Sequence, residues 1–417
     1  MTMRIGFIST RLMGTDGVSL EVEKWSRVLQ RMGHQVFFCA GELGGYAGSG
    51  ALIPELHFHH PAILEINQRA FGEAPPQESG SIHKAIHALA GEIRPRLAHF
   101  IHANQLDLII VQNALAIPMN LPLGVCLTDL IKETHIPTIA HHHDFYWERQ
   151  RYQASLIPDI LDSCFPPHLP AIQHITINSI AQHRLKARRG IDSIVVPNVH
   201  DFATPPPGMD DYNRDFRHSL GLQDNDLMIL QPTRVIQRKG IELSIELVNR
   251  LNLPNASLFI THRADDEGLS YWHWLQREAA SMKVPLVLID QLIGEERSRK
   301  NGQKIYTLWD AYPHANLVTY PSLYEGFGNA LLETIYFKRL AVVNRYPVYV
   351  ADLAPLGFEF VELEGFVGEN AVRQVSELLH HPEKVRQMAD KNYQIAQENF
   401  SLGTLDKKIN ELIANIA

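Results

Sequence analysis

The chain has 417 residues, of which 45% are hydrophobic and 20% are charged, a length sufficient for two domains that each bury a core. Its formal net charge of -8 argues against a nucleic-acid-binding protein, which usually presents a basic surface. No apolar run approaches the roughly 18 residues that a membrane-spanning helix needs, so we expect no membrane span.

Two further features of the composition predict where the protein resides. The N-terminal residues lead directly into an apolar strand, so we expect no secretory signal. Cys39, Cys126 and Cys164 are odd in number and have no metal-like spacing, which is typical of reduced thiols. We therefore expect a cytoplasmic protein.

The first half alternates apolar runs with helical stretches. The first of these runs is a strand at residues 4–9, and an amphipathic helix at residues 17–32 follows it. The predicted strands are residues 4–9, 35–39, 106–111, 138–140, 174–177 and 193–196. Val, Ile and Phe fill these runs without polar alternation, as in parallel strands that are buried on both faces. Strands separated by helices indicate a doubly wound α/β sheet with right-handed crossovers.

A break in this pattern occupies residues 198–215, where Thr204-Pro-Pro-Pro-Gly208 precedes a polar stretch without periodicity. We interpret it as an interdomain linker. The acid pairs Asp210-Asp211 and Asp265-Asp266 lie in polar segments, and we interpret them as solvated loops without a metal.

The second half repeats the alternation of strands and helices. Its predicted strands are residues 227–231, 257–260, 286–289, 317–319 and 340–343, and two helices follow in 382–417. The sequence thus predicts two Rossmann-like domains, residues 1–200 and 216–400. Ligands of such sheets bind outside the carboxyl ends of the strands, so we expect the domains to face each other across a deep cleft.

Two carboxylates lie on either side of a strand-to-helix turn in the second half. Gly326 and Gly328 permit a tight backbone there, with Glu325 on the loop and Glu333 one turn into a helix predicted at 329–338. A helix N-terminus preceded by small residues is a natural phosphate site, yet carboxylates beside it would repel phosphate. A ligand that carries hydroxyl groups as well as phosphates, namely a nucleotide sugar, accounts for both.

Two cations follow the strand 227–231, at the start of the next helix. Arg234 offers a fork to phosphate oxygens and Lys239 a mobile point charge, so together they suit a diphosphate. We expect them to face the Glu325 turn from two or three strands away, and a solvated basic loop is the alternative. Arg238 is interpreted as a surface residue.

With these residues in view, the chain resembles a retaining glycosyltransferase of family 4, which has the GT-B fold. The matching motifs are Arg-x4-Lys-Gly at 234–240, Glu-Gly-Phe-Gly-x4-Glu at 325–333, Pro197-Asn198 and a glycine-containing first loop at 14–17. They span both domains over nearly the whole chain. The resemblance implies a hexosyltransferase.

The resemblance also implies roles for the donor residues. Arg234 and Lys239 would bind the donor diphosphate, Glu325 the hydroxyls of the transferred sugar, and Glu333 the ribose. The last helix, 402–417, would pack back on the N-terminal domain. The remaining donor-site candidates are Gly17, which permits close backbone approach, and the turn residues Gly326, Phe327, Gly328 and Asn329.

Three histidines precede an aspartate after the strand 138–140. Adjacent residues of an extended chain point to opposite faces, so His141, His142 and His143 do not converge on one metal ion. His143-Asp144 resembles the His-Asp pair of the family, in which the histidine touches the donor sugar. A structural histidine is the alternative, and it has more weight for His141 and His142.

The acceptor candidates lie in the first domain. They are Asp16, Asn113, Arg149 and Arg151, of which Asp16 is equally interpretable as a helix N-cap and the arginines as a charged surface. The loop 14–17 departs from a G-x-G-x-x-G fingerprint and lacks the acid that binds ribose in dehydrogenases. This loop argues against a dinucleotide cofactor.

The predicted reaction is hexose transfer from a nucleoside diphosphate sugar with retention at the anomeric carbon. Arg234 and Lys239 would stabilise the charge of the leaving diphosphate. No carboxylate nucleophile stands opposite the sugar, and the resemblance implies same-face attack with a donor phosphate oxygen taking the proton. We expect no metal and no cofactor beyond the nucleotide-sugar co-substrate.

The acceptor is expected to be soluble, because the acidic chain has no membrane-docking helix or basic patch, and anionic, because Arg11, Arg149 and Arg151 lie near the site. Transfer from UDP-glucose to fructose 6-phosphate, as in sucrose-phosphate synthases, is favoured, although Thr15-Asp-Gly-Val18 replaces their usual Gly-Gly-Gln loop. The alternative is a transferase that uses GDP-mannose or an NDP-glucose to make a glycerate-type solute. A GT-B-like epimerase or phosphorylase, a dehydrogenase and a silent sugar-nucleotide-binding protein are the rivals, and the oligomeric state is left open.

Overall fold

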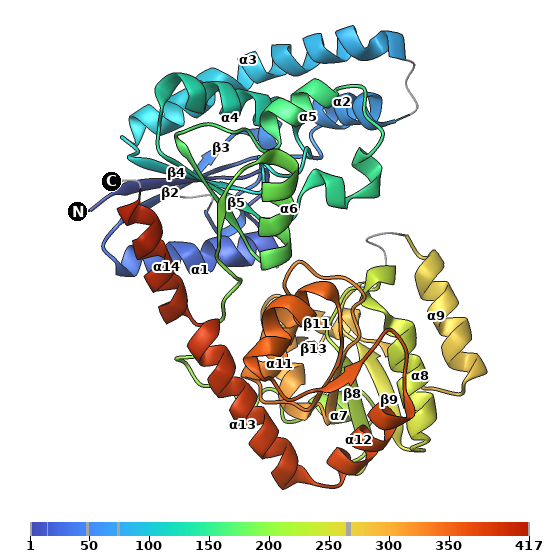
Figure 1. Ribbon diagram of the computed structural model, residues 1–417. Coiled ribbons are helices and arrows are strands. Elements are labelled where there is room, and N and C mark those ends of the chain that lie inside the picture. Colours follow the sequence, from blue (N-terminus) through green and yellow to red (C-terminus); the bar gives the residue numbers. More distant parts are fainter. Residues whose placement is uncertain (1, 15, 47–49, 73–75, 264–267, 416–417) are drawn as a thin grey trace. The chain divides into compact units, whose positions relative to one another are not determined.

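The computed structural model describes residues 2–14, 16–46, 50–72, 76–263 and 268–415. The chain divides into two compact units: unit 1 comprises Met1–Asn198 with Leu402–Ala417, and unit 2 comprises Val199–Ser401. Each unit is a parallel sheet with helices packed on its faces (Figure 1). The predicted pair of Rossmann-like α/β sheets is therefore confirmed.

Within its described residues, unit 1 contains a seven-stranded sheet in the order β3-β2-β1-β4-β5-β6-β7. The strands are β1 (Arg4–Ile8), β2 (Gln35–Ala40), β3 (Gly50–Leu52), β4 (Leu108–Gln112), β5 (Thr138–His142), β6 (Ile172–Thr176) and β7 (Ser193–Val195). The central strands β4 and β5 are buried at every position. Burial on both faces explains why they read as continuous apolar runs in the sequence.

The helices of unit 1 are α1 (Gly17–Arg31), α2 (Pro61–Phe71), α3 (Ser79–Ala103), α4 (Leu121–Thr134), α5 (Pro158–Cys164), α6 (Ser179–Arg189) and α14 (Leu402–Ala414). In Figure 1, α2, α3 and α4 pack together on one face of the sheet, and α1 and α14 lie together on the other. The last helix thus completes the layer that α1 begins.

Unit 2 has, in its described part, a six-stranded parallel sheet in the order β10-β9-β8-β14-β15-β16. The strands are β8 (Leu227–Gln231), β9 (Ala256–Ile260), β10 (Leu286–Leu288), β14 (Leu317–Tyr320), β15 (Ala341–Asn344) and β16 (Val361–Leu363). The helices are α7 (Phe216–Ser219), α8 (Ile241–Leu251), α9 (Ser270–Ser281), α10 (Leu308–Ala311), α11 (Asn329–Tyr336), α12 (Glu369–Leu379) and α13 (Pro382–Asn399). Apolar side chains of α8, α9 and α12 share one core with the sheet.

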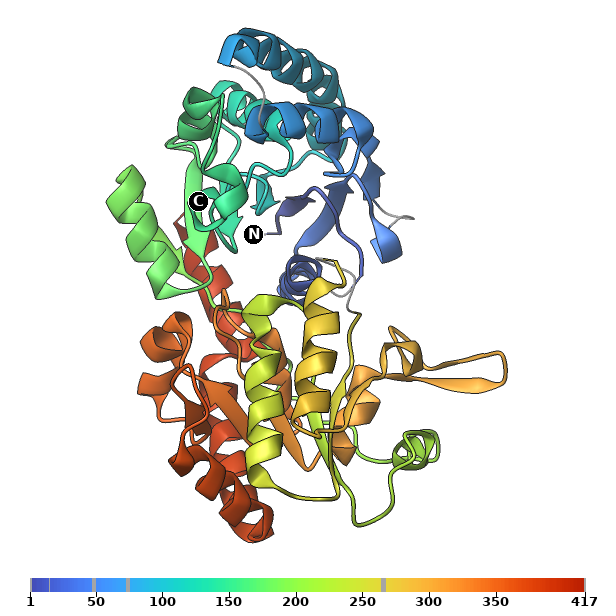
Figure 2. The same cartoon turned by 90° about the vertical axis from the view of Figure 1, so that its right-hand side faces the viewer.

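Three further short strands leave the unit 2 sheet between β10 and β14. They are β11 (Ile293–Gly294), β12 (Ser298–Lys300) and β13 (Gln303–Thr307). Figure 2 shows residues 298–305 as a hairpin that projects from unit 2. Its turn residues Asn301 and Gly302 both have positive φ, 52° and 83°, as two-residue hairpin turns require.

The segment 198–215, predicted to be a linker, is instead packed onto unit 2. The Asn213 amide donates to Asp310 Oδ1 at 3.1 Å. Arg297 Nη1 donates to Asp210 Oδ2 at 2.7 Å and its guanidinium also pairs with Asp310. Asp210 and Asp211 are exposed, as predicted for a solvated loop, although Asp210 also pairs with Arg297. Asp265-Asp266 lies outside the described residues.

No helix in the described part of the chain combines the length and apolar character that crossing a membrane requires.

Candidate active site

The two donor motifs follow neighbouring strands of the unit 2 sheet. β8 and β14 pair directly, with Ile229 opposite Leu317, so the loops after both strands leave the same edge side by side. The predicted separation of two or three strands is wrong, because strand order in a doubly wound sheet does not follow sequence order. The two motifs therefore meet without an intervening element.

The backbones of the two loops are joined. Leu323 N donates to Arg238 O at 2.8 Å. Gly240 has φ of +59°, and a Cβ at this position would lie 2.5 Å from Pro321 O. Both the positive φ and the close approach require glycine.

A buried ion cluster forms where the loops meet. Lys239 Nζ bonds Glu325 Oε1, and Arg238 Nη1 donates to Glu325 Oε2 at 2.8 Å and to Tyr324 O at 3.2 Å. Glu325 and Lys239 are only 6% and 8% exposed. Arg238, interpreted from the sequence as a surface residue, is partly exposed and also binds the same carboxylate as Lys239.

The cluster keeps Glu325 ionised. Burial raises the pKa of Glu325, but the Lys239 ammonium and the Arg238 guanidinium outweigh it and bring the pKa to about 2. Burial lowers the pKa of Lys239, and the Glu325 carboxylate opposes that shift. The exposed Arg234 also lowers the pKa of Lys239, so a third positive charge lies near the two that bind the carboxylate. The net positive charge suits an anion.

The helix start after Glu325 is held by buried hydroxyls. Gly328 precedes α11 with φ of +125°, and a Cβ there would lie 2.8 Å from the Tyr346 hydroxyl. That hydroxyl donates to the carbonyl of the buried Phe327 at 2.7 Å. One turn into α11, Glu333 accepts a bond from the Tyr312 hydroxyl at 3.2 Å. The other predicted donor residues of this turn are half-buried beside the helix start: Gly326 and Asn329.

In unit 1, Asn113 joins the loops that follow β4 and β5. It has φ of +59°, its Nδ2 donates to Asp144 Oδ1 at 3.0 Å, and its Oδ1 accepts from His143 N at 3.1 Å. Gln112 Oε1 lies 3.2 Å from His143 Nε2. The structure thus brings Asn113, His143 and Asp144 together, and it adds Gln112, which the sequence reading missed.

The three consecutive histidines alternate between the faces of the sheet, as expected. The His141 and His143 rings lie on the same side, with centroids 4.5 Å apart, whereas His142 Nε2 lies 2.9 Å from His174 Nδ1. Burial lowers the pKa of His143 to about 4, although Asp144 and Asp16 oppose the shift, and burial also lowers the pKa of His174 to about 4. These imidazoles are neutral at pH 7. Among the described residues no group of three or more His, Cys, Asp or Glu could hold a metal ion.

Asp16 forms the N-cap of α1. Its Oδ1 accepts from Val18 N at 3.0 Å and Ser19 N at 3.2 Å, and its Oδ2 lies 3.1 Å from Arg11 Nη2. The sequence allowed Asp16 to be either a helix N-cap or an acceptor-binding residue, and these hydrogen bonds are those of the N-cap. Gly17 is the exposed first residue of the same helix.

The two arginines predicted for the acceptor differ in their contacts. The Arg149 guanidinium binds Asp144, with Nε donating to Oδ2 at 2.7 Å, so it belongs to the group around His143. The Arg151 guanidinium instead lies over the Tyr152 ring, 4.6 Å from its centroid. The structure therefore does not bring Arg151 into that group.

A further polar group lies at the carboxyl ends of β1 to β3. The sequence predicted Arg11 near the site but missed the other members of this group. The Arg11 guanidinium lies 5.3 Å from the centroid of the Phe58 ring, and His57 Nε2 lies 3.2 Å from Glu42 Oε2. The run His57-Phe-His-His60 is the sequence signal for it.

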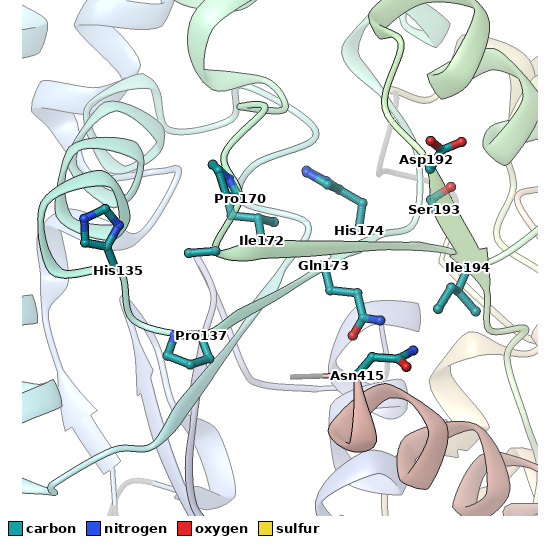
Figure 3. Close-up of a pocket in the computed structure, with 11 residues that line it drawn as sticks. His135, Pro137, Pro170, Ile172, Gln173, His174, Asp192, Ser193, Ile194 and Asn415 are labelled. Carbon is teal, nitrogen blue, oxygen red and sulfur yellow. The ribbon is translucent and has the colours of Figure 1, made fainter. Parts of the chain in front are cut away.

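A cavity of about 460 Å³ lies at the opposite edge of the unit 1 sheet. Figure 3 shows its lining, which includes His135 before β5, Pro170 before β6 and Asp192 before β7. These are amino ends of strands, whereas ligands of such sheets bind at carboxyl ends. None of the predicted site residues lines this cavity.

Comparison with known proteins identifies the family. No protein-family model matches the chain. It is 32% identical to the mannosylglucosylglycerate synthase of Petrotoga mobilis, over 99% of this chain and 98% of the relative. The chain belongs to the mannosylglucosylglycerate synthase family. The mannosylglucosylglycerate synthase of Thermotoga maritima is 34% identical, over 97% of this chain and 98% of the relative.

Solved structures agree on the fold of this family member. A glycosyltransferase from Rickettsia africae superposes with a TM-score of 0.71 at 13% identity, over 100% of this chain and 98% of the other. The predictions of the GT-B fold and of a sugar-transferring enzyme are confirmed. The relatives carry the name of a glycerate-solute synthase, which favours the alternative reading over sucrose-phosphate synthesis.

Proposed function

We propose that this protein transfers a mannosyl group from GDP-mannose to glucosylglycerate, with retention at the anomeric carbon. The observation that carries the proposal is the match to two mannosylglucosylglycerate synthases over essentially their whole length. The proposal takes glucosylglycerate in place of fructose 6-phosphate as the acceptor, and GDP-mannose in place of UDP-glucose as the donor. An anionic acceptor is common to both readings, because glycerate carries a carboxylate.

The ion cluster of unit 2 supports a nucleoside diphosphate sugar as the donor. Arg234 and Lys239 would neutralise the diphosphate, beside the N-terminal amides of α11. Charge on the leaving diphosphate grows in the transition state, so the same groups lower the barrier. Glu325 would accept hydrogen bonds from the transferred sugar and Glu333 from the ribose.

The neutral state of His143 supports a hydrogen-bonding role toward the sugar. With the pKa of His143 lowered to about 4, its imidazole carries no charge at pH 7. We assign it to orienting a sugar hydroxyl. Asn113 bonds the His143 backbone and Gln112 bonds its ring. Because the imidazole is already held in place, sugar binding costs less conformational entropy.

The proposal includes neither a metal nor a cofactor, since the cations of unit 2 supply the charge that the diphosphate needs. The reaction is placed in the cytoplasm with a soluble acceptor, which the three buried free thiols support. Arg11 and Arg149 are the candidates for binding the glycerate carboxylate. Both lie at the carboxyl edge of the unit 1 sheet.

A panel of donors and acceptors tests the proposal. GDP-mannose and UDP-glucose are each incubated with glucosylglycerate, fructose 6-phosphate or water, and release of nucleoside diphosphate is measured. We expect release only from GDP-mannose with glucosylglycerate, and an α-linked product by NMR. Turnover of UDP-glucose with fructose 6-phosphate alone would overturn the assignment, and release without any acceptor would indicate an epimerase or hydrolase.

A further inference from the structure

Glu325 is held by two cations from the same short loop. Lys239 bonds one carboxylate oxygen and Arg238 bonds the other at 2.8 Å. The sequence motif explains Lys239, but it assigns nothing to Arg238. Two cations on one buried carboxylate are more than charge neutrality requires.

Donor binding creates a conflict within this cluster. The ammonium that a diphosphate needs, Lys239 Nζ, is already bonded to Glu325. If Lys239 turned to the phosphates and nothing replaced it, Glu325 would be an uncompensated buried carboxylate, which is strongly unfavourable. A second cation that stays with Glu325 removes this penalty.

We propose that Arg238 is a positioning residue that retains Glu325 while Lys239 exchanges this carboxylate for the donor diphosphate. The inference rests on the proposed function only in taking a nucleotide sugar as the ligand. It assigns Arg238 a role through Glu325, without contact to the substrate.

The contacts of the two cations favour this division of roles. Arg238 is attached to the Glu325 loop three times: its carbonyl accepts from Leu323 N at 2.8 Å, and its guanidinium bonds both Tyr324 O and Glu325. Among the described residues, the ammonium of Lys239 donates a hydrogen bond to Glu325 and to no other group. Lysine is a point charge on a flexible stem, whereas the planar guanidinium suits fixed multiple bonds. The geometry therefore leaves Lys239 as the cation that moves.

The pKa of Glu325 supports the same division. Arg238 is one of the two cations that bring this pKa to about 2 against the effect of burial. With Lys239 turned away, Arg238 is the remaining charge that keeps the carboxylate ionised and able to accept hydrogen bonds from sugar hydroxyls.

A double-mutant cycle measured by GDP binding tests the exchange directly. Calorimetry compares the full-length protein, Arg238→Gln, Glu325→Gln and the double variant. We expect Arg238→Gln to weaken GDP binding about tenfold, because moving Lys239 to the diphosphate then leaves the buried Glu325 carboxylate without a cation. In the Glu325→Gln background, where Lys239 is already released, Arg238→Gln should change GDP affinity less than twofold.

The opposite result identifies a direct contact. An equal loss of GDP affinity in both backgrounds would mean that Arg238 binds the diphosphate itself, which overturns a positioning role. Unchanged affinity in Arg238→Gln would overturn it as well. Failure of the unsubstituted protein to bind GDP at all, with UDP bound instead, would contradict the proposed donor and leave the cycle to be measured with UDP.

Kinetics supply a readout that loss of stability does not produce. In Arg238→Gln the acid limb of kcat/KM for GDP-mannose should move to higher pH, since one of the cations that depress the pKa of Glu325 is gone. Arg238→Lys, which keeps a charged donor, should restore most of the profile. Arg386→Gln, which removes an exposed arginine paired with Glu383 on α13, is the matched control and should behave as the unsubstituted protein. A fall in activity with no shift of the acid limb and no rescue by lysine would contradict the inference.

Discussion

The carboxyl edges of the two sheets use different chemistry. In unit 2 the edge is charged: Lys239 and Arg238 surround Glu325 in a buried cluster. In unit 1 the neutral His143 is held by the amides of Asn113 and Gln112, and the neighbouring charged groups, Asp144 and Arg149, are paired with each other. Charge at a buried site favours binding of a charged group, whereas neutral donors and acceptors orient hydroxyls. The difference agrees with the roles proposed above, in which the cations of unit 2 bind the diphosphate and His143 of unit 1 orients a sugar hydroxyl.

The largest expected effect lies in the charged edge. Glu325→Gln keeps the shape of the side chain but removes its charge, and we expect kcat to fall by about 10²–10³-fold. GDP-mannose turnover measured at saturating acceptor gives the size of the loss. Alanine is a poorer probe, because it leaves the buried Lys239 without its partner and is expected to destabilise unit 2.

Glu333→Gln is the matched comparison for that variant. Its carboxylate is bonded to the Tyr312 hydroxyl and is assigned to the ribose, so we expect mainly a higher KM for the donor. A Glu325→Gln variant with kcat within twofold of the unsubstituted protein would remove the charged edge from the mechanism.

The two units should lose stability in different pH ranges. Burial lowers the pKa of His174 to about 4, so the unfolded chain binds a proton below pH 6.5 that the folded state does not. The contribution of His174 to the stability of unit 1 is therefore fully present above pH 6.5 and is lost, by about 3 kcal/mol, as the pH drops toward 4. The pKa of Glu325 is lowered to about 2, so its contribution in unit 2 is lost only as the pH falls from 4.5 toward 2.

Hydrogen exchange read by peptide resolves the two windows. We expect the strands around His142 and His174 to lose protection between pH 6.5 and 4 while β8 and β14 retain theirs. His141→Phe sharpens the comparison: this ring lies against Trp25, with ring centroids 5.1 Å apart, and within the described residues neither of its nitrogens has a hydrogen-bond partner. The variant should lose less stability at pH 5 than the unsubstituted protein, and equal acid sensitivity of both units would contradict the contrast.

The smallest expected effect concerns Asp16. Asn at this position keeps the cap on α1, whereas Ala removes it at a cost of about 1 kcal/mol. We expect Asp16→Asn to match the unsubstituted protein in thermal midpoint and in KM for glucosylglycerate, and Asp16→Ala to lose stability only. A higher acceptor KM in Asp16→Asn at an unchanged thermal midpoint would indicate that the Asp16 carboxylate binds the acceptor.

Much of the fold was predictable because its strands are buried on both faces. The strand predicted at residues 227–231 has the observed bounds of β8, and a helix follows it, as expected. The edge strands β3 (Gly-Ala-Leu) and β16 (Val-Glu-Leu) were missed because neither is a continuous run of large apolar residues; β7 and β10 are equally short but lie in such runs and were predicted. The segment 198–215 was misread because its polar side chains, which look solvated in sequence, find specific partners on unit 2.

The site was predictable where a motif carries the chemistry and not where tertiary contacts do. Glu325 and Lys239 stood out by residue type and spacing. Arg238 did not, because its role depends on β8 lying beside β14, and no local pattern reports strand order. Gln112 was missed for the same reason: a glutamine at a strand end is ordinary until the neighbouring loop places His143 against it.

The two places where the chain passes from one unit to the other have a consequence for how such a protein is built. His200 N donates to Phe400 O at 2.8 Å, and His200 forms a bridge with Ser401, so unit 2 starts and ends at hydrogen-bonded neighbours. Unit 2 is thus an uninterrupted insertion within unit 1, with its two ends side by side. A gene fragment encoding residues 199–401 carries all of unit 2, whereas no single continuous fragment encodes unit 1 without it.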